Sequence, residues 1–254
     1  MVDKLTIISY NLHGLTQGKP GIDEIILKIE PDLIMVQEHW LTPDNFCKLN
    51  SLSSKYFVFG SSAMNSVVNS GPLYGRPFGG TAILINNEHV SSIVCITTSD
   101  RFTAIKLHNW LFITVYMPCV GTVQRDELYL NILADLQAII SDHSECHCFI
   151  GGDFNIDLNS QLNINLTVNE FIEYNSLSRC DVIGIHISMN LIIQVALSTT
   201  CLQLIVTELL VLTYWILTLT YQIMFPSWQF VHVTSHLFHY VKLLSRNLRL
   251  WSLI

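Results

Sequence analysis

The chain has 254 residues, enough for one large domain or for one domain with an appendage. Its formal net charge of −7 argues against a broad basic surface that grips nucleic acid through counterion release alone, but allows a nuclease with a local metal site. The seven cysteines lack metal-site spacing and the N-terminus lacks the layout of a signal peptide, so we expect a reduced, intracellular protein of the nucleus or cytoplasm.

The first predicted strand is a β-rich apolar run from Leu5 to Tyr10. It ends in a polar segment closed by a glycine, and Asn11 follows it directly. A helix is expected behind Gly21, because isoleucines recur there at helical spacing, at positions 22, 25, 26 and 29.

The second predicted strand runs from Leu33 to Gln37, after Pro31 has stopped the helix, and it ends in Glu38. This order of strand, helix and strand is typical of α/β proteins. Thr42 and Pro43 then fit the N-cap and first position of a short helix.

The middle of the chain is expected to consist mainly of strands. The long polar segment from Ser61 to Gly75 indicates a surface function, and the last strand of this region ends in Tyr116. A tight turn is predicted at His108 and Asn109. The expected strands cover residues 56–60, 90–97, 102–107 and 111–116.

A helix and a buried strand come next. The strand is the apolar run from Cys146 to Ile150, and two glycines after it are expected to give the chain freedom for a sharp exit toward Asp153 and Asn155. The helix is predicted from Asp126 to about Ser141, with one apolar face made by Leu130, Leu133, Leu136 and Ile140.

Five polar residues thus follow predicted strands, and in a layered α/β fold such strand ends can converge on one edge. Oxygen-rich clusters of this kind suit Mg²⁺, and metal-assisted phosphoester hydrolysis is the chemistry they serve best. Taken one at a time, the residues also fit ordinary turns, a packing aromatic and a solvated acid. The residues are Asn11, Glu38, Tyr116, Asp153 and Asn155.

Four stretches resemble the endonuclease/exonuclease/phosphatase superfamily, which has the deoxyribonuclease I-like fold. They are SYNLHG at 9–14, MVQEHW at 35–40, VYMP at 115–118 and GGDFN at 151–155. They are most similar to the apurinic endonuclease-type domains of LINE-class retrotransposons, and RPFGGTAIL at 76–84 supports that subgroup. The resemblance covers residues 4–181 and implies an α/β four-layer sandwich, in which two mostly antiparallel sheets are flanked by helices.

The resemblance also implies roles for the site residues. Asn11 and Glu38 would hold a catalytic Mg²⁺ (or Mn²⁺) ion, and Tyr116 would contact the scissile phosphate. Asp153 would position or deprotonate the attacking water, and Asn155 would help to stabilise the transition state. The implied substrate is DNA, and the implied partner is the reverse transcriptase domain of a full-length element, which this sequence does not contain.

Three charged or ionisable residues near the motifs are interpreted as surface or supporting residues: His13, His39 and Arg125. The family also uses a later Ser-x-Ile-Asp motif and a C-terminal Ser-Asp-His motif, and neither occurs in this sequence. Because no aspartate follows Asp181, activity is expected to be impaired.

The stretch from 182 to 254 has a different composition: between Val182 and Val241 the only charged residue is Glu208. One interpretation is a membrane span from Leu202 to Phe225, and another is a buried core element. The interpretation we favour is an out-of-frame translation of the missing C-terminal part.

The genetic code is compatible with a shifted frame. Codons for residues 221–226, read from the third base, are able to encode Ser-Asp-His-Val-Pro, and codons for 196–200 are able to encode Ser-Ile-Asp-Tyr. The expected function is therefore Mg²⁺-dependent nicking of DNA, impaired by the lost motif. The alternatives are a phosphatase or phospholipase of the same superfamily, and a non-catalytic, membrane-associated product.

Overall fold

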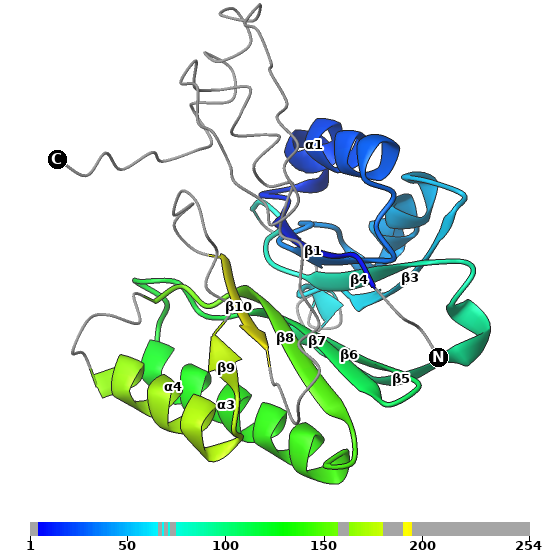
Figure 1. Cartoon of the computed structure of the whole chain (residues 1–254). Coiled ribbons are helices and arrows are strands. Elements are labelled where there is room, and N and C mark those ends of the chain that lie inside the picture. The colour runs from blue at the N-terminus through cyan, green and yellow to red at the C-terminus, as the bar shows by residue number, and fades with distance from the viewer. Residues whose placement is uncertain are drawn as a thin grey trace, which may run out of the picture. The chain divides into compact units, whose positions relative to one another are not determined.

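The computed structural model describes residues 5–65, 68, 71, 75–156, 163–179 and 190–194, and all of them lie in one compact unit of the chain. Two β-sheets pack against each other within this unit, and helices cover their outer faces (Figure 1). The predicted four-layer sandwich is therefore confirmed.

The first sheet has four strands in the order β1-β2-β4-β3. β1 and β2 are parallel and the other neighbours are antiparallel. Figure 1 shows α1 beside this sheet. The strands are Ile7–Asn11 (β1), Leu33–Gln37 (β2), Tyr56–Ser61 (β3) and Thr81–Asn86 (β4), and the helices near them are Leu15–Lys28 (α1), Pro43–Ser51 (η1, a 3-10 helix) and Val90–Ser92 (η2, also 3-10).

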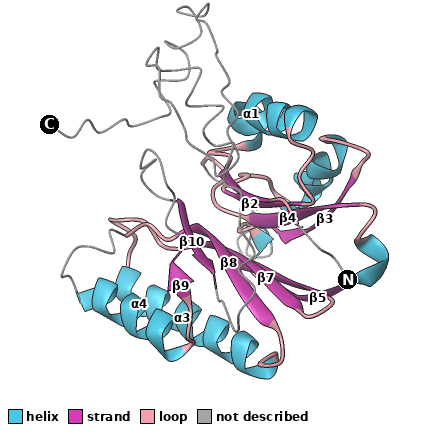
Figure 2. Cartoon of the chain, in the orientation of Figure 1, coloured by secondary structure: helices cyan, strands magenta, loops and turns pink. Residues whose placement is uncertain are grey.

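The second sheet has six strands in the order β5-β6-β7-β8-β10-β9. β7 and β8 are parallel, and the other neighbours are antiparallel. α3 and α4 lie together on one side of it (Figure 2). The elements are Ile93–Thr98 (β5), Phe102–Leu107 (β6), Trp110–Tyr116 (β7), Arg125–Asp142 (α3), His147–Asp153 (β8), Asn163–Tyr174 (α4), Ser178–Arg179 (β9) and Asn190–Gln194 (β10).

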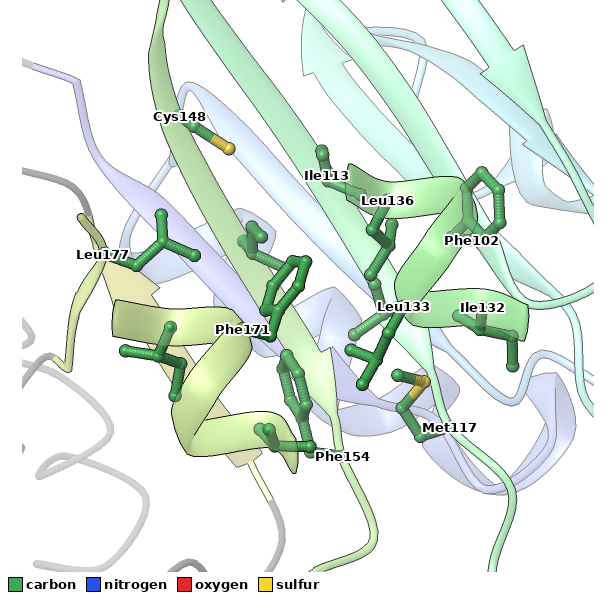
Figure 3. Packing of buried hydrophobic residues seen from close by; sticks show 14 of the residues in the cluster. Phe102, Ile113, Met117, Ile132, Leu133, Leu136, Cys148, Phe154, Phe171 and Leu177 are labelled. Atoms are coloured by element: carbon green, nitrogen blue, oxygen red, sulfur yellow. The ribbon is translucent and has the colours of Figure 1, made fainter. Parts of the chain in front are cut away.

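Alternation along the strands divides the core into two layers, because successive side chains of a strand point to opposite faces. In β7, Phe112 faces the other sheet and packs with Met35 and Phe149, whereas Ile113 faces the helices. Figure 3 shows Ile113 gathered with side chains of α3 and α4. The labelled residues of this layer between the sheet and the helices are Phe102, Ile113, Met117, Ile132, Leu133, Leu136, Cys148, Phe154, Phe171 and Leu177.

Helix α1 begins at Leu15, well before the predicted start behind Gly21. The glycines inside it serve close packing: a Cβ at Gly18 would lie 2.5 Å from the Leu12 carbonyl oxygen, and one at Gly21 would lie 2.3 Å from Tyr10 Oη. The helix therefore packs directly on the end of β1, and its glycines mark this contact rather than its start.

Of the predicted apolar face of α3, Leu133 and Leu136 are buried and Ile140 packs against the same core, but Leu130 does not belong to it. Leu130 is 48% exposed, while Tyr129 is fully buried and donates a hydrogen bond to the Phe154 carbonyl oxygen at 2.9 Å. Helix α4 was not predicted, although its buried residues have helical spacing. They are Ile164, Asn165, Val168, Phe171 and Ile172.

The glycines after Ile150 do not form the predicted exit from the strand, because β8 continues through both of them to Asp153. A Cβ at Gly151 would lie 2.7 Å from Met35 Sδ of the other sheet, and one at Gly152 would lie 2.1 Å from the Val115 carbonyl oxygen. The two glycines let β8 approach its neighbours closely, which places Asp153 at the end of a rigid strand.

Strand β10 lies beyond Asp181, within the stretch 182–254 that was expected to be a non-homologous tail. It pairs with β8 over its whole length, from Asn190 opposite Asp153 to Gln194 opposite Phe149. Among the described residues no helix is long and apolar enough to cross a membrane. The predicted span from Leu202 to Phe225 lies outside the described residues, and the boundary at Asp181 stays a prediction.

We expect Gly152→Ala to destabilise the fold by roughly 2–3 kcal/mol more than Gly121→Ala does, measured by urea unfolding. Both glycines have positive φ, +149° and +92°, so both substitutions cost backbone strain. Only Gly152 has an obstacle at its Cβ, since Gly121 has no heavy atom within 4 Å. An equal loss of unfolding free energy in the two variants would show that β7 and β8 have room for a side chain at Gly152.

Candidate active site

The predicted site residues follow the carboxyl ends of four strands, and the structure brings these ends together. Asn11 ends β1, which runs parallel to β2, and Glu38 directly follows β2. Tyr116 and Asp153 end β7 and β8, and they are partners across that parallel ladder. Because parallel neighbours end at the same edge of a sheet, each sheet contributes one pair of residues to the site.

Asn11 joins the two carboxylates of the site. Its Nδ2 donates hydrogen bonds to Glu38 Oε1 at 2.8 Å and to Asp153 Oδ2 at 3.0 Å. Its Oδ1 accepts a bond from the backbone N–H of His13 at 2.9 Å, which defines the orientation of the amide, because a reversed amide would set donor against donor. The same amide therefore holds residues from both sheets.

Asp153 is the buried member of the carboxylate pair, with 3% of its surface exposed. Burial, together with the weaker effect of the Glu38 charge, raises the pKa of this carboxyl to about 6, although hydrogen bonds from Asn155 and Asn11 lower it. The backbone N–H of Asn155 donates to Asp153 Oδ1 at 3.0 Å. A carboxyl with this pKa is ionised at pH 8 and accepts protons near neutrality, as a general base must.

Glu38 is held in a strained position. Its φ is +54°, a left-handed conformation that is uncommon outside glycine, asparagine and aspartate. Its Oε2 accepts a hydrogen bond from Trp40 Nε1 at 3.0 Å and lies 3.8 Å from His13 Nδ1. Only 12% of the side chain is exposed, so Glu38 faces the site instead of being the solvated loop acid of the alternative interpretation.

Asn155 belongs to a turn that the surrounding backbone holds in place. Its φ is +51°, and its Nδ2 donates to the Met117 carbonyl oxygen at 2.9 Å. Arg125 binds the same turn, with Nη2 donating to the Asn155 carbonyl oxygen at 2.9 Å and Nε to that of Pro118 at 3.1 Å. The role of the Asn155 side chain in the transition state stays a prediction.

Tyr116 is half-buried beside the carboxylates. Burial raises the pKa of its phenol, and the charges of Glu38, Cys119 and Asp153 raise it further, in that order. The Arg101 guanidinium lies 5.4 Å from the ring centroid. The phenol therefore stays neutral at ordinary pH and is able to donate a hydrogen bond to a phosphate oxygen.

Gln37, predicted only as the end of a strand, is a supporting residue of the site. Its fully buried Nε2 donates to Ser9 Oγ at 3.2 Å and across the sandwich to Thr114 Oγ1 at 2.7 Å. A second link between the sheets joins Thr81 Oγ1 and Thr103 Oγ1 at 3.0 Å. These polar bonds between otherwise apolar layers fix how the two halves of the site face each other.

The three neighbouring residues fit their predicted supporting roles. His39 is 1% exposed, and its ring nitrogens bond to backbone groups of Ser61 and Leu41, while burial lowers its pKa to about 4. The side chain of His13 is 60% exposed, and Arg125 binds backbone carbonyls of the Asn155 turn. Even His13 lies farther from Glu38, at 3.8 Å, than Asn11 does, at 2.8 Å.

The carboxylate pair fits a hard divalent cation. Mg²⁺ keeps several waters and takes one or two carboxylates, so a larger cluster is not needed; within the described ranges no group of three or more His, Cys, Asp and Glu side chains has metal-binding geometry. Glu38 and Asp153 repel each other, and a cation relieves that repulsion. Asn11 presents its Nδ2 to both carboxylates and its Oδ1 to the backbone N–H of His13, so its predicted role as a ligand stays a prediction.

Comparisons with known proteins point to the same fold and family. A family model described as the endonuclease/exonuclease/phosphatase family matches residues 8–169. No curated protein matches the chain in sequence.

Three solved structures share this fold with low sequence identity. The 3′ phosphatase NExo from Neisseria, bound to a product DNA hairpin, has 13% identity and a TM-score of 0.54, with 75% of this chain and 86% of that chain covered. The human Nocturnin catalytic domain with bound sulfate has 14% identity and a TM-score of 0.52, with coverage of 73% and 79%. An AP endonuclease from Archaeoglobus fulgidus has 12% identity and a TM-score of 0.52, with coverage of 75% and 86%.

We expect the metal-free protein to become less stable, relative to Asp153→Asn, as pH rises from 4 to 8. The pKa of Asp153 is about 6 in the fold against 3.8 for a free side chain, so ionisation in the fold costs roughly 3 kcal/mol above pH 6. Because the pKa is raised, this cost is absent below pH 4. Asparagine does not ionise, so its advantage in melting temperature, measured with EDTA present, should grow over that range.

Asp135→Asn is the matched control for this measurement, because Asp135 is an exposed aspartate on α3. Its melting temperature should follow that of the unsubstituted protein at every pH. A difference between Asp153→Asn and the unsubstituted protein that stays constant from pH 4 to 8 would contradict the raised pKa.

Proposed function

Because the chain belongs to the endonuclease/exonuclease/phosphatase family, we propose that it hydrolyses phosphodiester bonds of DNA with the help of Mg²⁺ or Mn²⁺. The single observation that carries this proposal is the carboxylate pair of Glu38 and Asp153, bridged by Asn11, with the phenol of Tyr116 at the same edge. A buried base, a cation-binding acid and a neutral donor are the groups that attack of water on a phosphodiester requires.

Each residue has a distinct task in the proposed reaction. Asp153, ionised above pH 6, takes a proton from the attacking water, and Asn155 keeps it aimed through the bond from its backbone N–H. Tyr116 donates a hydrogen bond to a phosphate oxygen, where negative charge accumulates. Glu38 holds the cation, which when bound supplies positive charge that stabilises the transition state.

We further propose that the chain derives from a LINE-type retrotransposon endonuclease and is impaired. The motif stretches support this origin, including RPFGGTAIL at 76–84. The sequence has no aspartate after Asp181, so it lacks the Ser-Asp-His motif that completes the general acid/base groups of such enzymes. In the full-length element a reverse transcriptase domain would follow, and the site of action would be intracellular, in the nucleus or cytoplasm.

The cause we propose for the missing motif is a shifted reading frame in 182–254. The support is the agreement between the codons available to 196–200 and 221–226 and the two missing motifs, which return in family order. The nucleotide sequence tests this directly. If the shifted frame encodes neither Ser-x-Ile-Asp nor Ser-Asp-His, the stretch has another origin, and a membrane-associated product becomes the alternative.

A phosphatase of the same superfamily is the second candidate function. It is favoured by two structural neighbours: NExo is named a 3′ phosphatase, and another neighbour, with a TM-score of 0.50, is a mannosyl-6-phosphatase from Bacteroides thetaiotaomicron. Parallel assays on plasmid DNA, a sugar phosphate and a phosphoinositide would separate nuclease, phosphatase and phospholipase activity.

We expect the purified protein to nick supercoiled plasmid slowly, only with Mg²⁺ or Mn²⁺ present, and faster once the shifted frame is restored. Asp153→Ala should lower the nicking rate by about 100-fold or more, since it removes the base. Asp135→Asn should leave it unchanged. The readout is the conversion of supercoiled to open-circular plasmid on a gel.

Two outcomes would contradict parts of this account. Nicking that survives Asp153→Ala unchanged would show that the carboxylate pair is not the active site. If this chain nicks plasmid as fast as the frame-restored protein does, and Asp153→Ala abolishes the nicking, the missing histidine is not required.

A further inference from the structure

Trp40 lies beside the carboxylate pair in a position that several contacts fix. Its Nε1 donates to Glu38 Oε2 at 3.0 Å, and its backbone N–H donates to the Gly79 carbonyl oxygen at 3.0 Å. Its φ of +52° is a rare conformation for a bulky residue, and such strain is typical of functional sites. Gly14 makes room for it, because a Cβ there would lie 2.5 Å from the indole ring.

The exposed side chain of Arg76 rests on this indole ring. Its guanidinium carbon lies 4.1 Å from the ring centroid, a close cation–π contact. With its amide oriented so that both ends have partners, Gln17 accepts a hydrogen bond from Arg76 Nη2 at 3.2 Å and donates to the His13 carbonyl oxygen at 2.7 Å. The His13 ring lies 4.6 Å from that of Trp40, so the guanidinium belongs to an ordered group of side chains.

Among the described residues, no carboxylate neutralises the charge of Arg76. Within the part of the chain that the structure describes, no Asp or Glu oxygen lies within 4.0 Å of this guanidinium, although Trp40 connects it to Glu38. The contact with the indole fixes the guanidinium in place, and among the described residues Gln17 alone accepts a hydrogen bond from it, which leaves its other N–H groups to bind oxygen atoms in pairs. A planar cation held in this way suits a phosphate.

We propose that Arg76, positioned by Trp40, binds a second phosphate of the substrate strand, next to the phosphate that is cleaved at the carboxylates. This inference rests on the proposed phosphodiesterase function and names its substrate class: a polynucleotide with consecutive phosphates, in preference to an ester with a single phosphate.

The test is the binding of a fluorescent 12-base-pair duplex by anisotropy in EDTA, at a series of salt concentrations. Arg76→Gln should weaken binding by roughly 3- to 10-fold at low salt and lower the slope of log Kd against log salt by about 1, because one phosphate contact is lost. Arg76→Lys should keep the slope while binding more weakly than the unsubstituted protein, because it keeps the charge and loses the stacked plane.

Lys55→Gln is the matched control. Lys55 is an exposed cation directly before β3, whose first residue pairs with Asn86, at the end of the sheet opposite to Thr81. The Lys55→Gln variant should bind the duplex as tightly as the unsubstituted protein does. Bis(p-nitrophenyl) phosphate, which has one phosphate, should be hydrolysed equally by Arg76→Gln and the unsubstituted protein.

The outcomes separate this inference from the proposed function. An unchanged affinity and salt slope in Arg76→Gln would overturn the second phosphate site, even if plasmid is nicked. A lower affinity and slope in Arg76→Gln, with Lys55→Gln unaffected, would support it even if no substrate is hydrolysed. A drop in bis(p-nitrophenyl) phosphate hydrolysis by Arg76→Gln, by the same factor as its drop in duplex affinity, is a further possible result. That result would also overturn the inference, because Arg76 would then act at the phosphate that is cleaved.

Discussion

The side-chain amide of Asn11 donates hydrogen bonds to two carboxylates from different sheets, and the rest of the site depends on these two bonds. Glu38 and Asp153 repel each other, and only a donor placed between them, or a cation, makes their approach favourable. The amide is effective only if the two sheets keep one relative position. The buried bond from Gln37 to Thr114 supplies that constraint beneath the site, because it crosses from one sheet to the other.

The arrangement of the site lowers the stability of the fold. A buried carboxyl with a pKa near 6 is unfavourable to ionise, and the left-handed backbone at Glu38 adds strain of the kind that functional sites retain. The packed interior offsets these costs: the close approach of β7 and β8 at Gly152 makes the end of β8 rigid. Asp153 is therefore presented from a strand end whose position the core determines.

Much of the sandwich and of the site was predictable from the sequence, because strand periodicity is a local signal and polar residues follow the ends of those strands. The structure brings Asn11 and Glu38 together with Asp153, and the strand over 33–37 has the predicted bounds. What depends on contacts between distant segments was not predictable. The burial of Tyr129 in α3 and the positions of Trp40 and Gln37 follow from neighbours that are far away in the sequence.

If Glu38 holds a divalent cation beside Asp153, calorimetric titration of the protein with Mg²⁺ at pH 8 should detect the binding of a single ion. Binding should weaken at least about 10-fold in Glu38→Gln, because the carboxylate that would hold the ion is lost, and should be unchanged in Asp135→Asn. Binding with equal affinity in all three proteins, or no binding in any of them, would contradict this role of Glu38.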